Sequence, residues 1–405
     1  MPRCRVCGSP ELVSILDLGQ VPLANSFRAP DDSTIEPLFD LGIQWCGSCA
    51  IVQLTSLVDP ETLFRHYLYT PSASATWIAH CEELASWMWE RSGKNRDAFV
   101  VEPASNDGAL LKKVRLLMPR ILGVEPARNI AELALADGIP TLPEFFGVST
   151  ARQIRKEHGP ADIVVGTNVL AHVPNIVDFL VGARELLNDD GIVVIEAPYL
   201  PDLVDRVAFD TIYHEHVSYL SVTALDRIYR LAGLNLTSVE RTPVHGGSIR
   251  FTGGLSDVLF DASVRTFLHT EAEMGYADGT ALTGFAARVD DTREQLREVV
   301  SELRASGLRI AGYGATAKGN TLLTTSGLDS RDIEYIVDKN PMKVGLVAPG
   351  TAIPIVGVEY LNQHPVDVLL ILAWNLSDEI IQQQQAHRQR GGRFLIPLPS
   401  PWFSE

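Results

Sequence analysis

Apolar and polar residues alternate along the middle of the chain in a way that predicts strands and helices in turn. From about residue 97, the apolar runs AFVVEP, RILGVEP, ADIVVGT and IVVIEAPYL predict four strands. Segments with helical spacing separate them, and the last of these, IVDFLVGARELLNDDG, is predicted to end at Gly191. Repeated units of this kind build a parallel sheet with helices on both faces. Residues 95–255 are therefore predicted to form a Rossmann-like domain.

The same alternation returns in the last third of the chain. A long helix is predicted over about 283–305, and LRIAGYGATAKGNTLL then predicts a strand, a glycine turn and a helix. The strands IEYIVD and VDVLLIL and a closing helix, LSDEIIQQQQAHRQR, follow. We assign residues 256–405 to a second, smaller Rossmann-like domain, so that the fold class is α/β.

The first 94 residues lack this alternation. Residues 59–94 carry apolar positions at helical spacing and predict a helical arm, with Cys81 buried in a helix. Residues 1–58 contain two CxxC pairs, Cys4 with Cys7 and Cys46 with Cys49. Two such pairs can supply four thiolates to a tetrahedral zinc ion. We predict one structural Zn²⁺ with a closed coordination sphere, the alternative being two reduced, buried pairs without metal.

Composition narrows the class of protein. The 405 residues include 46% hydrophobic and 21% charged residues, as in a globular protein of two or three domains. The net charge of −16 argues against a nucleic-acid binder, because neutralising phosphates requires clustered Lys and Arg. No run approaches the length of a membrane helix and the start resembles no signal peptide. We expect a cytoplasmic protein that acts as a monomer.

The first strand of the middle domain runs into an acidic turn, VVEPASNDG. A pyrophosphate binder has GxGxxG there, whereas this turn places Asp107 where a pyrophosphate would be repelled. The positive sulfonium of S-adenosylmethionine (SAM) suits an acidic site, and Glu125 at the next strand end can hold ribose hydroxyls. NAD binding and a purely structural turn remain alternatives. The predicted cofactor-binding residues are Glu102, Ala104, Ser105, Asn106, Gly108, Glu125 and Asn168.

TIYHEHVSYL places Tyr213, His214, Glu215 and His216 in four consecutive positions. In an extended segment, Tyr213 and Glu215 would share one face and the two histidines the other. A metal site, a proton-transfer site and a structural polar network are all compatible with this cluster.

Several motifs, in order, resemble those of nucleotide-deoxysugar C-methyltransferases of antibiotic biosynthesis, and the resemblance covers nearly the whole chain. They are the two CxxC pairs, VPLANSF, EPASNDG, NVLAHVP, YHEHVSYLS, HGGSIR, GYGATAKGNTLL and LAWNLSDEI. The resemblance implies transfer of a methyl group from SAM to C-3 of a dTDP-4-keto-2,6-dideoxy sugar, with a zinc that is only structural.

The resemblance also implies roles for individual residues. His216 corresponds to the general base that removes the C-3 proton, and imidazole suits this role because its ordinary pKa lies near neutrality. Tyr213 and His172 are candidates to donate hydrogen bonds to the keto or enolate oxygen. Glu215 would orient a ring or bind a sugar hydroxyl, and His214 is expected to be structural.

Two further segments are candidates for binding the nucleotide. In HGGSIR, Arg250 could grip a diphosphate and Ser248 could assist, while a turn into an edge strand is the alternative. In GYGATAKGN, Lys318 and Asn320 could meet the same nucleotide, or the turn only packs a helix on the sheet. The chain departs from the family at YLYTPSAS, where Thr70 and Pro71 replace two serines, so a different accepted sugar is expected if this arm caps the substrate.

Three other functions stay open at this point. The methyl group could go to an oxygen or nitrogen, in which case a C-3 hydrogen would not exchange with solvent. The chain could be a non-catalytic zinc and Rossmann scaffold, although clustered bases argue against that. An NAD-dependent sugar epimerase or dehydratase is disfavoured by the acidic SNDG turn.

Overall fold

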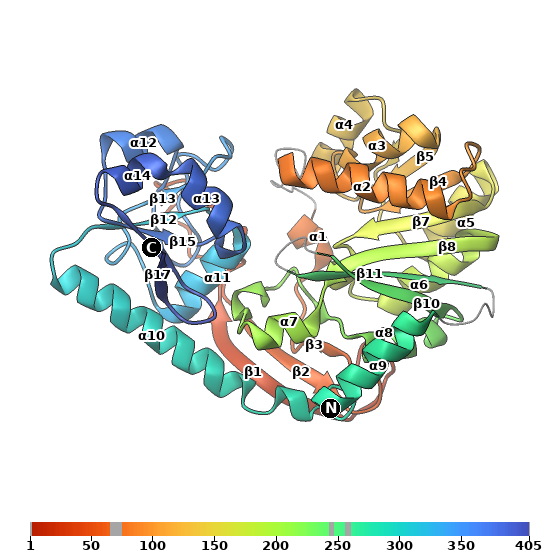
Figure 1. Cartoon of the computed structure of the whole chain (residues 1–405), viewed down its shortest axis with the longest axis horizontal. Helices are drawn as coiled ribbons and strands as arrows, with labels where there is room; N and C mark the ends of the chain where they lie inside the picture. The colour runs from red at the N-terminus through yellow and green to blue at the C-terminus, as the bar shows by residue number, and fades with distance from the viewer. Residues whose placement is uncertain (1, 65–74, 243–246, 256–260, 405) are drawn as a thin grey trace.

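The computed structural model describes residues 2–64, 75–242, 247–255 and 261–404 and arranges them around three β-sheets (Figure 1). The whole YLYTPSAS segment (67–74), and His245 and Gly246 of HGGSIR, lie outside the described residues. Within the described ranges, no helix is long and apolar enough to cross a membrane.

The central sheet is the α/β domain expected for the middle of the chain. Its seven strands lie in the order β10-β11-β8-β7-β4-β5-β6, and β11 runs antiparallel to both of its neighbours. The strands are β4 (Phe99–Pro103), β5 (Arg120–Val124), β6 (Thr141–Leu142), β7 (Ala161–Thr167), β8 (Leu187–Pro198), β10 (Asn235–Thr242) and β11 (Ser248–Gly254). β4 is buried at all five positions, as expected for a parallel strand covered on both faces.

Helices cover both faces of this sheet (Figure 1). They are α2 (Ala75–Arg91), α3 (Ala109–Leu117), α4 (Arg128–Ala136), α5 (Val148–His158), α6 (Ile176–Leu186), α8 (Val222–Leu231) and α9 (Ala262–Met274). The short α7 (Leu200–Asp205) packs instead in a core with the N-terminal sheet. The hydroxyl of Ser221 caps α8 by accepting from the Ala224 N–H at 3.1 Å. Cys81 lies in α2 and is buried, as predicted, and the short α1 (Pro60–Phe64) precedes it.

The predicted end of the sixth helix is wrong. α6 ends at Leu186, and β8 begins with the next residue, where Leu187 pairs with Ala161 of β7. The Arg155 guanidinium accounts for the early end, because it donates to the carbonyls of Glu185, Leu186 and Leu187. These are the carbonyls that the end of a helix leaves without partners.

The N-terminal sheet contains a strand from the middle of the chain. Its order is β1 (Leu12–Val21), β2 (Phe39–Cys46), β3 (Val52–Leu54) and β9 (Ser218–Tyr219), all antiparallel. β9 follows directly after the YHEH motif. The N-terminal module is therefore hydrogen-bonded to the segment that carries the candidate bases.

The C-terminal sheet has the order β14-β13-β12-β15-β16-β17. Its strands are β12 (Ile310–Tyr313), β13 (Ile336–Val337), β14 (Ile355–Val356), β15 (Val368–Ile371), β16 (Arg393–Ile396) and β17 (Trp402–Ser404), with helices α10 (Phe285–Ala305), α11 (Ala317–Ser326) and α12 (Val358–Gln363). The closing helix is predicted as one but is two, α13 (Ser377–Gln383) and α14 (Gln385–Gln389). The break is at Gln384, whose side chain donates to the Tyr313 hydroxyl at 3.0 Å.

One hydrophobic core joins the N-terminal and C-terminal sheets. It contains Leu41 of β2, Phe209 of the middle segment, Phe285 of α10 and Leu323 of α11, all fully buried. The N-terminal and C-terminal units therefore pack together around residues 200–219 from the middle of the chain.

Candidate active site

The acidic turn after β4 has a strained backbone. Ala104 and Asn106 both have positive φ, 55° and 49°, which side chains other than glycine rarely adopt. The Ala104 N–H donates to the Val124 carbonyl of β5 at 2.7 Å, and the Asn106 N–H donates to the Glu125 carboxylate at 2.9 Å. These bonds hold the turn over the carboxyl ends of β4 and β5, where α/β sheets bind ligands.

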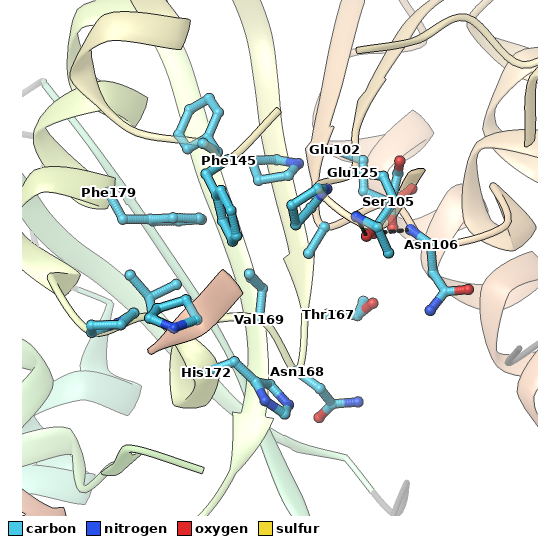
Figure 2. Close-up of a pocket in the computed structure, with 18 of the residues that line it drawn as sticks. Glu102, Ser105, Asn106, Glu125, Phe145, Thr167, Asn168, Val169, His172 and Phe179 are labelled. Carbon is cyan, nitrogen blue, oxygen red and sulfur yellow. Dashed lines mark hydrogen bonds between the residues drawn. The ribbon is translucent and has the colours of Figure 1, made fainter. Parts of the chain in front are cut away.

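A cavity of about 550 Å³ opens beside this turn. Glu102, Ser105, Asn106 and Glu125 border one side, the rings of Phe145 and Phe179 lie across from them, and Asn168 and His172 lie at one end (Figure 2). Six of the predicted cofactor-binding residues line the cavity: Glu102, Ala104, Ser105, Asn106, Glu125 and Asn168.

Gly108 is not among the lining residues and has a different reason to be glycine. Its φ is 74°, and a Cβ there would come within 3.0 Å of the Ile139 side chain. Gly108 therefore allows α3 to start close to the end of α4, and its effect on the cavity is indirect.

The lining is acidic. Its described residues include the carboxylates of Asp59, Glu61, Glu102, Asp107, Glu125 and Asp178, and no Lys or Arg. Burial, together with the charges of Asp107 and Glu125, raises the pKa of Glu102 well above its usual range. A positive ligand would favour the ionised form of such a carboxyl, and a pyrophosphate would be repelled.

Buried polar atoms at the turn fit a bound cofactor. Glu102 Oε2, Ser105 Oγ and Asp107 Oδ1 have no hydrogen-bond partner within the described protein, although the three residues are each 3% exposed. Buried polar groups in folded proteins are normally paired, so a ligand or ordered water is expected to form hydrogen bonds with these atoms. The acceptors and the absence of basic lining suit the sulfonium and ammonium groups of SAM.

The YHEH motif is a turn and not an extended strand, so the predicted alternation of faces is wrong. The His216 N–H donates to the Tyr213 carbonyl at 2.9 Å, which folds residues 213–216 back on themselves. Tyr213 and His216 therefore meet, with ring centroids 4.2 Å apart. His214 points elsewhere and packs edge-on against Phe39 of β2 at 5.7 Å.

The partners of His216 determine its tautomer. Nδ1 lies 2.8 Å from the Thr211 carbonyl oxygen, which can only accept, so Nδ1 carries the hydrogen. In the neutral ring the lone pair is then on Nε2, which lies 2.9 Å from the Tyr213 hydroxyl. The ring is buried, and its basic nitrogen faces a group that can donate a proton.

His172 connects this pair to the cavity. It lines the cavity, and its ring stands edge-on to that of His216 with centroids 4.7 Å apart. Burial lowers the pKa of His172 to about 4, and an interaction with the Glu215 backbone only partly opposes this shift. His172 is therefore neutral at physiological pH.

Glu215 faces the N-terminal module. Its carboxylate accepts from Asn25 Nδ2 at 2.6 Å, and Asn25 lies in the segment VPLANSF. Lys343 of the C-terminal unit is close enough for the charge of Glu215 to act on its pKa. All three parts of the chain thus meet at the motif.

Lys318 lies at the same junction. Its Nζ is 5.7 Å from the centroid of the Trp374 ring, and Trp374 Nε1 donates to the Asp210 carboxylate at 2.6 Å. Burial lowers the pKa of Lys318, an effect that the Asp210 charge opposes. Asn320, two residues after Lys318 on α11, is buried and donates to the Ala24 carbonyl at 2.8 Å.

Arg250 and Ser248 lie on β11, and the guanidinium of Arg250 already has acidic partners. It contacts Glu196 of β8 and Glu83 of α2, each at 2.7 Å, and stacks over Trp87. Glu196 also binds His80 of α2 at 2.6 Å. This pairing favours a role for Arg250 in fixing α2 on the sheet over one in binding a diphosphate.

The four predicted metal ligands come together. Cys4, Cys7, Cys46 and Cys49 place their sulfur atoms within 4.8 Å of one another, with Sγ–Sγ distances of 3.5 Å for Cys4 and Cys49 and 3.6 Å for Cys7 and Cys46. Four thiolates about 2.3 Å from a tetrahedral zinc would be about 3.8 Å apart. The cluster therefore fits one zinc ion, and no ligand position is left for a substrate.

Sequence reasoning missed Asn25, Asp210, Trp374 and Lys343. Each contacts a residue far away in the chain, as Asp210 does Trp374 and Asn25 does Glu215, so no local spacing indicates the contact. Asn25 and Trp374 lie within two of the segments that carry the family resemblance, VPLANSF and LAWNLSDEI. That was the available signal for them.

Comparison with known proteins identifies the chain's relatives. It is 37% identical over 402 residues to the C-methyltransferase NovU of Streptomyces niveus, covering 98% of this chain and 96% of NovU. Three family models match successive parts of it: a zinc binding domain at residues 4–64, a methyltransferase domain at 78–239 and a C-methyltransferase C-terminal domain at 243–399.

Several solved methyltransferase structures match less than half of the chain. The magnesium protoporphyrin IX methyltransferase ChlM from Synechocystis PCC 6803 is 10% identical, with a TM-score of 0.34, and the match covers 44% of this chain and 79% of ChlM. For the CcbJ methyltransferase from Streptomyces caelestis the values are 13%, 0.33, 43% and 88%. On the full-length relationship to NovU and the matching domain models, the chain belongs to the C-methyltransferase family and is a SAM-dependent C-methyltransferase with a zinc site.

Proposed function

We propose that the enzyme methylates C-3 of a dTDP-4-keto-2,6-dideoxy sugar by way of an enolate. The observation that carries the proposal is the geometry of His216, whose lone pair is on Nε2 and faces Tyr213, beside the cofactor cavity. A hydrogen on the carbon next to a ketone is acidic enough for an imidazole to remove when the enolate oxygen is stabilised.

The residues have separate roles in this proposal. His216 Nε2 takes the C-3 proton, and the C–H electron pair becomes the enolate. The Tyr213 hydroxyl, which contacts Nε2 in the free enzyme, donates to the keto oxygen when the sugar is bound. Glu215 binds a sugar hydroxyl or holds the turn, and the neutral His172 packs between the base and the cavity.

SAM supplies the methyl group, which leaves sulfur as the enolate carbon forms its new bond. The acidic lining of the cavity supports this ligand, since Glu102, Asp107 and Glu125 surround the turn and no Lys or Arg of the described chain lines it. Glu125 holds the turn through the Asn106 and Ala127 N–H groups and is proposed to bind the ribose hydroxyls. Asn168 and the backbone of the turn complete the proposed cofactor site.

The nucleotide is proposed to bind at the junction with the C-terminal unit. Lys318 is the candidate cation for the diphosphate, because it lies beside Asp210, one residue before the Thr211 carbonyl that holds His216. Asn320 is proposed to support the same wall.

Solvent exchange tests the proposal. The enzyme is incubated in D₂O with a dTDP-4-keto-2,6-dideoxyhexose, with and without SAM, and the sugar is examined by mass spectrometry. We expect deuterium at C-3 without SAM and a product one methyl heavier with it. His216→Ala should lose exchange by about 10²-fold or more, the scale of general base catalysis. If His216→Ala transferred the methyl group to the sugar as fast as the wild type does, the assignment of the base would be contradicted.

A further inference from the structure

The zinc module touches the segment that carries the candidate base at both of its ends. At the far end, Val217 follows His216, and its carbonyl accepts two hydrogen bonds from the module. One comes from the Leu54 N–H at 3.1 Å and the other from Arg5 Nη2 at 2.6 Å. The Val217 N–H donates to the Ala171 carbonyl at 2.7 Å. The backbone next to His216 is therefore fixed between the zinc module and the residue preceding His172.

Arg5 is built into the zinc knuckle. It lies between Cys4 and Cys7. Its Nη1 donates to the Leu54 carbonyl and its Nη2 donates to the Val217 carbonyl, each at 2.6 Å. Its backbone N–H donates to the buried side chain of Gln53 at 3.2 Å. Because a knuckle closed on a metal fixes the position of the residues between its ligands, the position of this guanidinium depends on the cluster.

The near end of the segment is held by Asn25. Its amide donates to the Glu215 carboxylate at 2.6 Å, a short bond of the charge-assisted kind. The neighbouring Ala24 carbonyl accepts from the buried Asn320 of α11, so that Asn25 is itself fixed from the C-terminal side. The loop that offers Asn25 is thus anchored independently of Glu215.

We propose that Arg5 and Asn25 are positioning residues for the reaction, and that the zinc module is a part of the active site that sets the place of His216 and Glu215. The inference rests on the proposed function, because it takes His216 as the base. Neither residue touches the reacting atoms; each acts through the turn at 213–217. A shift of about 1 Å in a catalytic group can reduce a rate by about 10²-fold, so small changes in this turn are sufficient.

The chain supplies a matched control for each residue. Arg3 also flanks Cys4, but it is exposed and donates only within the knuckle, to the Gly8 carbonyl at 2.9 Å. Gln20 lies in the same module as Asn25 and donates to Asp40 at 3.1 Å on the exposed side of β1. The experiment compares Arg5→Gln with Arg3→Gln, and Asn25→Ala with Gln20→Ala.

Four quantities are measured for each full-length variant: zinc content, SAM affinity by calorimetry, the rate of C-3 deuterium exchange at saturating sugar, and methyl transfer. We expect Arg5→Gln and Asn25→Ala to keep one zinc per chain and SAM affinity within about twofold, and to lose exchange by about tenfold or more. The Arg3→Gln and Gln20→Ala variants should match the wild type. Arg5→Lys, which keeps one donor, should recover part of the exchange.

The outcomes separate this inference from the proposed function. If the wild type exchanges and both Arg5→Gln and Asn25→Ala exchange at the same rate, the positioning role is wrong and the proposed function stands. If the wild type itself shows no exchange, the proposed function fails first. Should Arg5→Gln lose its zinc or fail to fold, Asn25→Ala decides alone, and an unchanged exchange rate there overturns the inference.

Discussion

At the scale of single residues, the site depends on side chains held in unfavourable states. Ala104, Asn106 and Asn168 border the cavity with positive φ, and of these alanine tolerates that region least. His172 is only partly exposed and is neutral because its pKa is lowered, and Glu102 is a buried carboxyl with a raised pKa. Such features are common where a binding site fixes its residues for function at the expense of stability.

Relieving the strain at Ala104 should not weaken the fold. Left-handed backbone costs an alanine about 1 kcal/mol, which offsets the entropy that a glycine adds to the unfolded chain. We expect Ala104→Gly to leave the free energy of unfolding unchanged or to raise it by up to about 1 kcal/mol. Ala134→Gly, in the buried interior of α4, should lower it by about 1 kcal/mol or more. Urea denaturation measures both, and an equal loss in the two variants would contradict the strain.

The neutral state of His172 predicts a pH dependence of stability. Its pKa is about 4 in the folded protein against an ordinary 6.5, so the unfolded chain takes up the proton first as the pH falls. The stability that depends on a neutral His172 is complete above pH 6.5 and is lost between pH 6.5 and 4. The loss amounts to up to about 3 kcal/mol.

Comparison with His172→Asn isolates this effect from other titrating groups. The difference in unfolding free energy between wild type and variant, measured by urea denaturation, should favour the wild type less at pH 4.5 than at pH 7.5. A difference that does not change with pH would show that His172 titrates normally.

At the scale of elements, helix α2 is fastened to the sheet by a charged network. Arg250 of β11 binds Glu83 of α2 and Glu196 of β8, and His80 of α2 binds Glu196 from the other side. Arg250 is 3% exposed and Glu196 is 2% exposed, so both charges are removed from water and depend on each other. The first turns of α2 also bring Trp77 to the cavity.

Breaking this network from one side should be costly. Arg250→Met leaves the Glu196 carboxylate buried with less compensation, and we expect a loss of about 3 kcal/mol in unfolding free energy. Arg241 on the adjacent β10 is the control: its ion pair with Asp202 is half exposed, and Arg241→Met should cost less than about 1 kcal/mol. Guanidinium denaturation measures both. If Arg250→Met instead kept its stability and raised only the KM for the nucleotide sugar, Arg250 would be a substrate ligand.

The elements were predictable where the chain carries a strong local pattern and less so elsewhere. The strand at 99–103 and the helix at 285–305 have clear periodicity and are where the pattern places them. The end of α6 was missed because Arg155, from another helix, terminates it. The turn at YHEH is not predicted from the sequence, because the contacts that accompany it, of His216 with Thr211 and of His214 with Phe39, follow no local pattern of apolar and polar residues.

The candidate site followed the same rule. The spacing of the four cysteines is typical of a zinc site, and the acidic turn lies at a strand end, where cofactors bind. Both groups of residues could therefore be predicted. Arg250 could not be judged, because its partners Glu83 and Glu196 lie 167 and 54 residues away in the chain. Asn25 is 190 residues from Glu215, and nothing in either segment alone indicates that they meet.

At the scale of the whole molecule, the zinc module and the C-terminal unit share one core with residues 200–219 from the middle of the chain, and both lie against the turn 213–217. β9 completes the sheet of the zinc module, and the buried Asn320 of α11 holds the loop that offers Asn25. The position of His216 is therefore set by contacts from all three units, so a structural change in any one unit should shift His216.

Removal of zinc tests this coupling. Treatment with a strong chelator should lower the melting temperature and abolish C-3 exchange. The four thiolates that hold the knuckle of Arg5 would then no longer be joined by a metal ion. The cofactor cavity has no cysteine in its lining, so SAM binding should weaken far less than exchange does. Calorimetry and exchange on the same sample, before and after zinc is restored, measure this. Full exchange by a zinc-free protein would contradict the coupling.

The position of the new methyl group tests the central claim most directly. The enzyme is supplied with the keto-deoxysugar and SAM labelled with ¹³C in its methyl group, and the product is examined by NMR. We predict that the labelled methyl is bonded to a carbon without hydrogen, adjacent to the keto carbon, as attack by the C-3 enolate requires. A labelled methyl bonded to oxygen or nitrogen would contradict carbon methylation through His216.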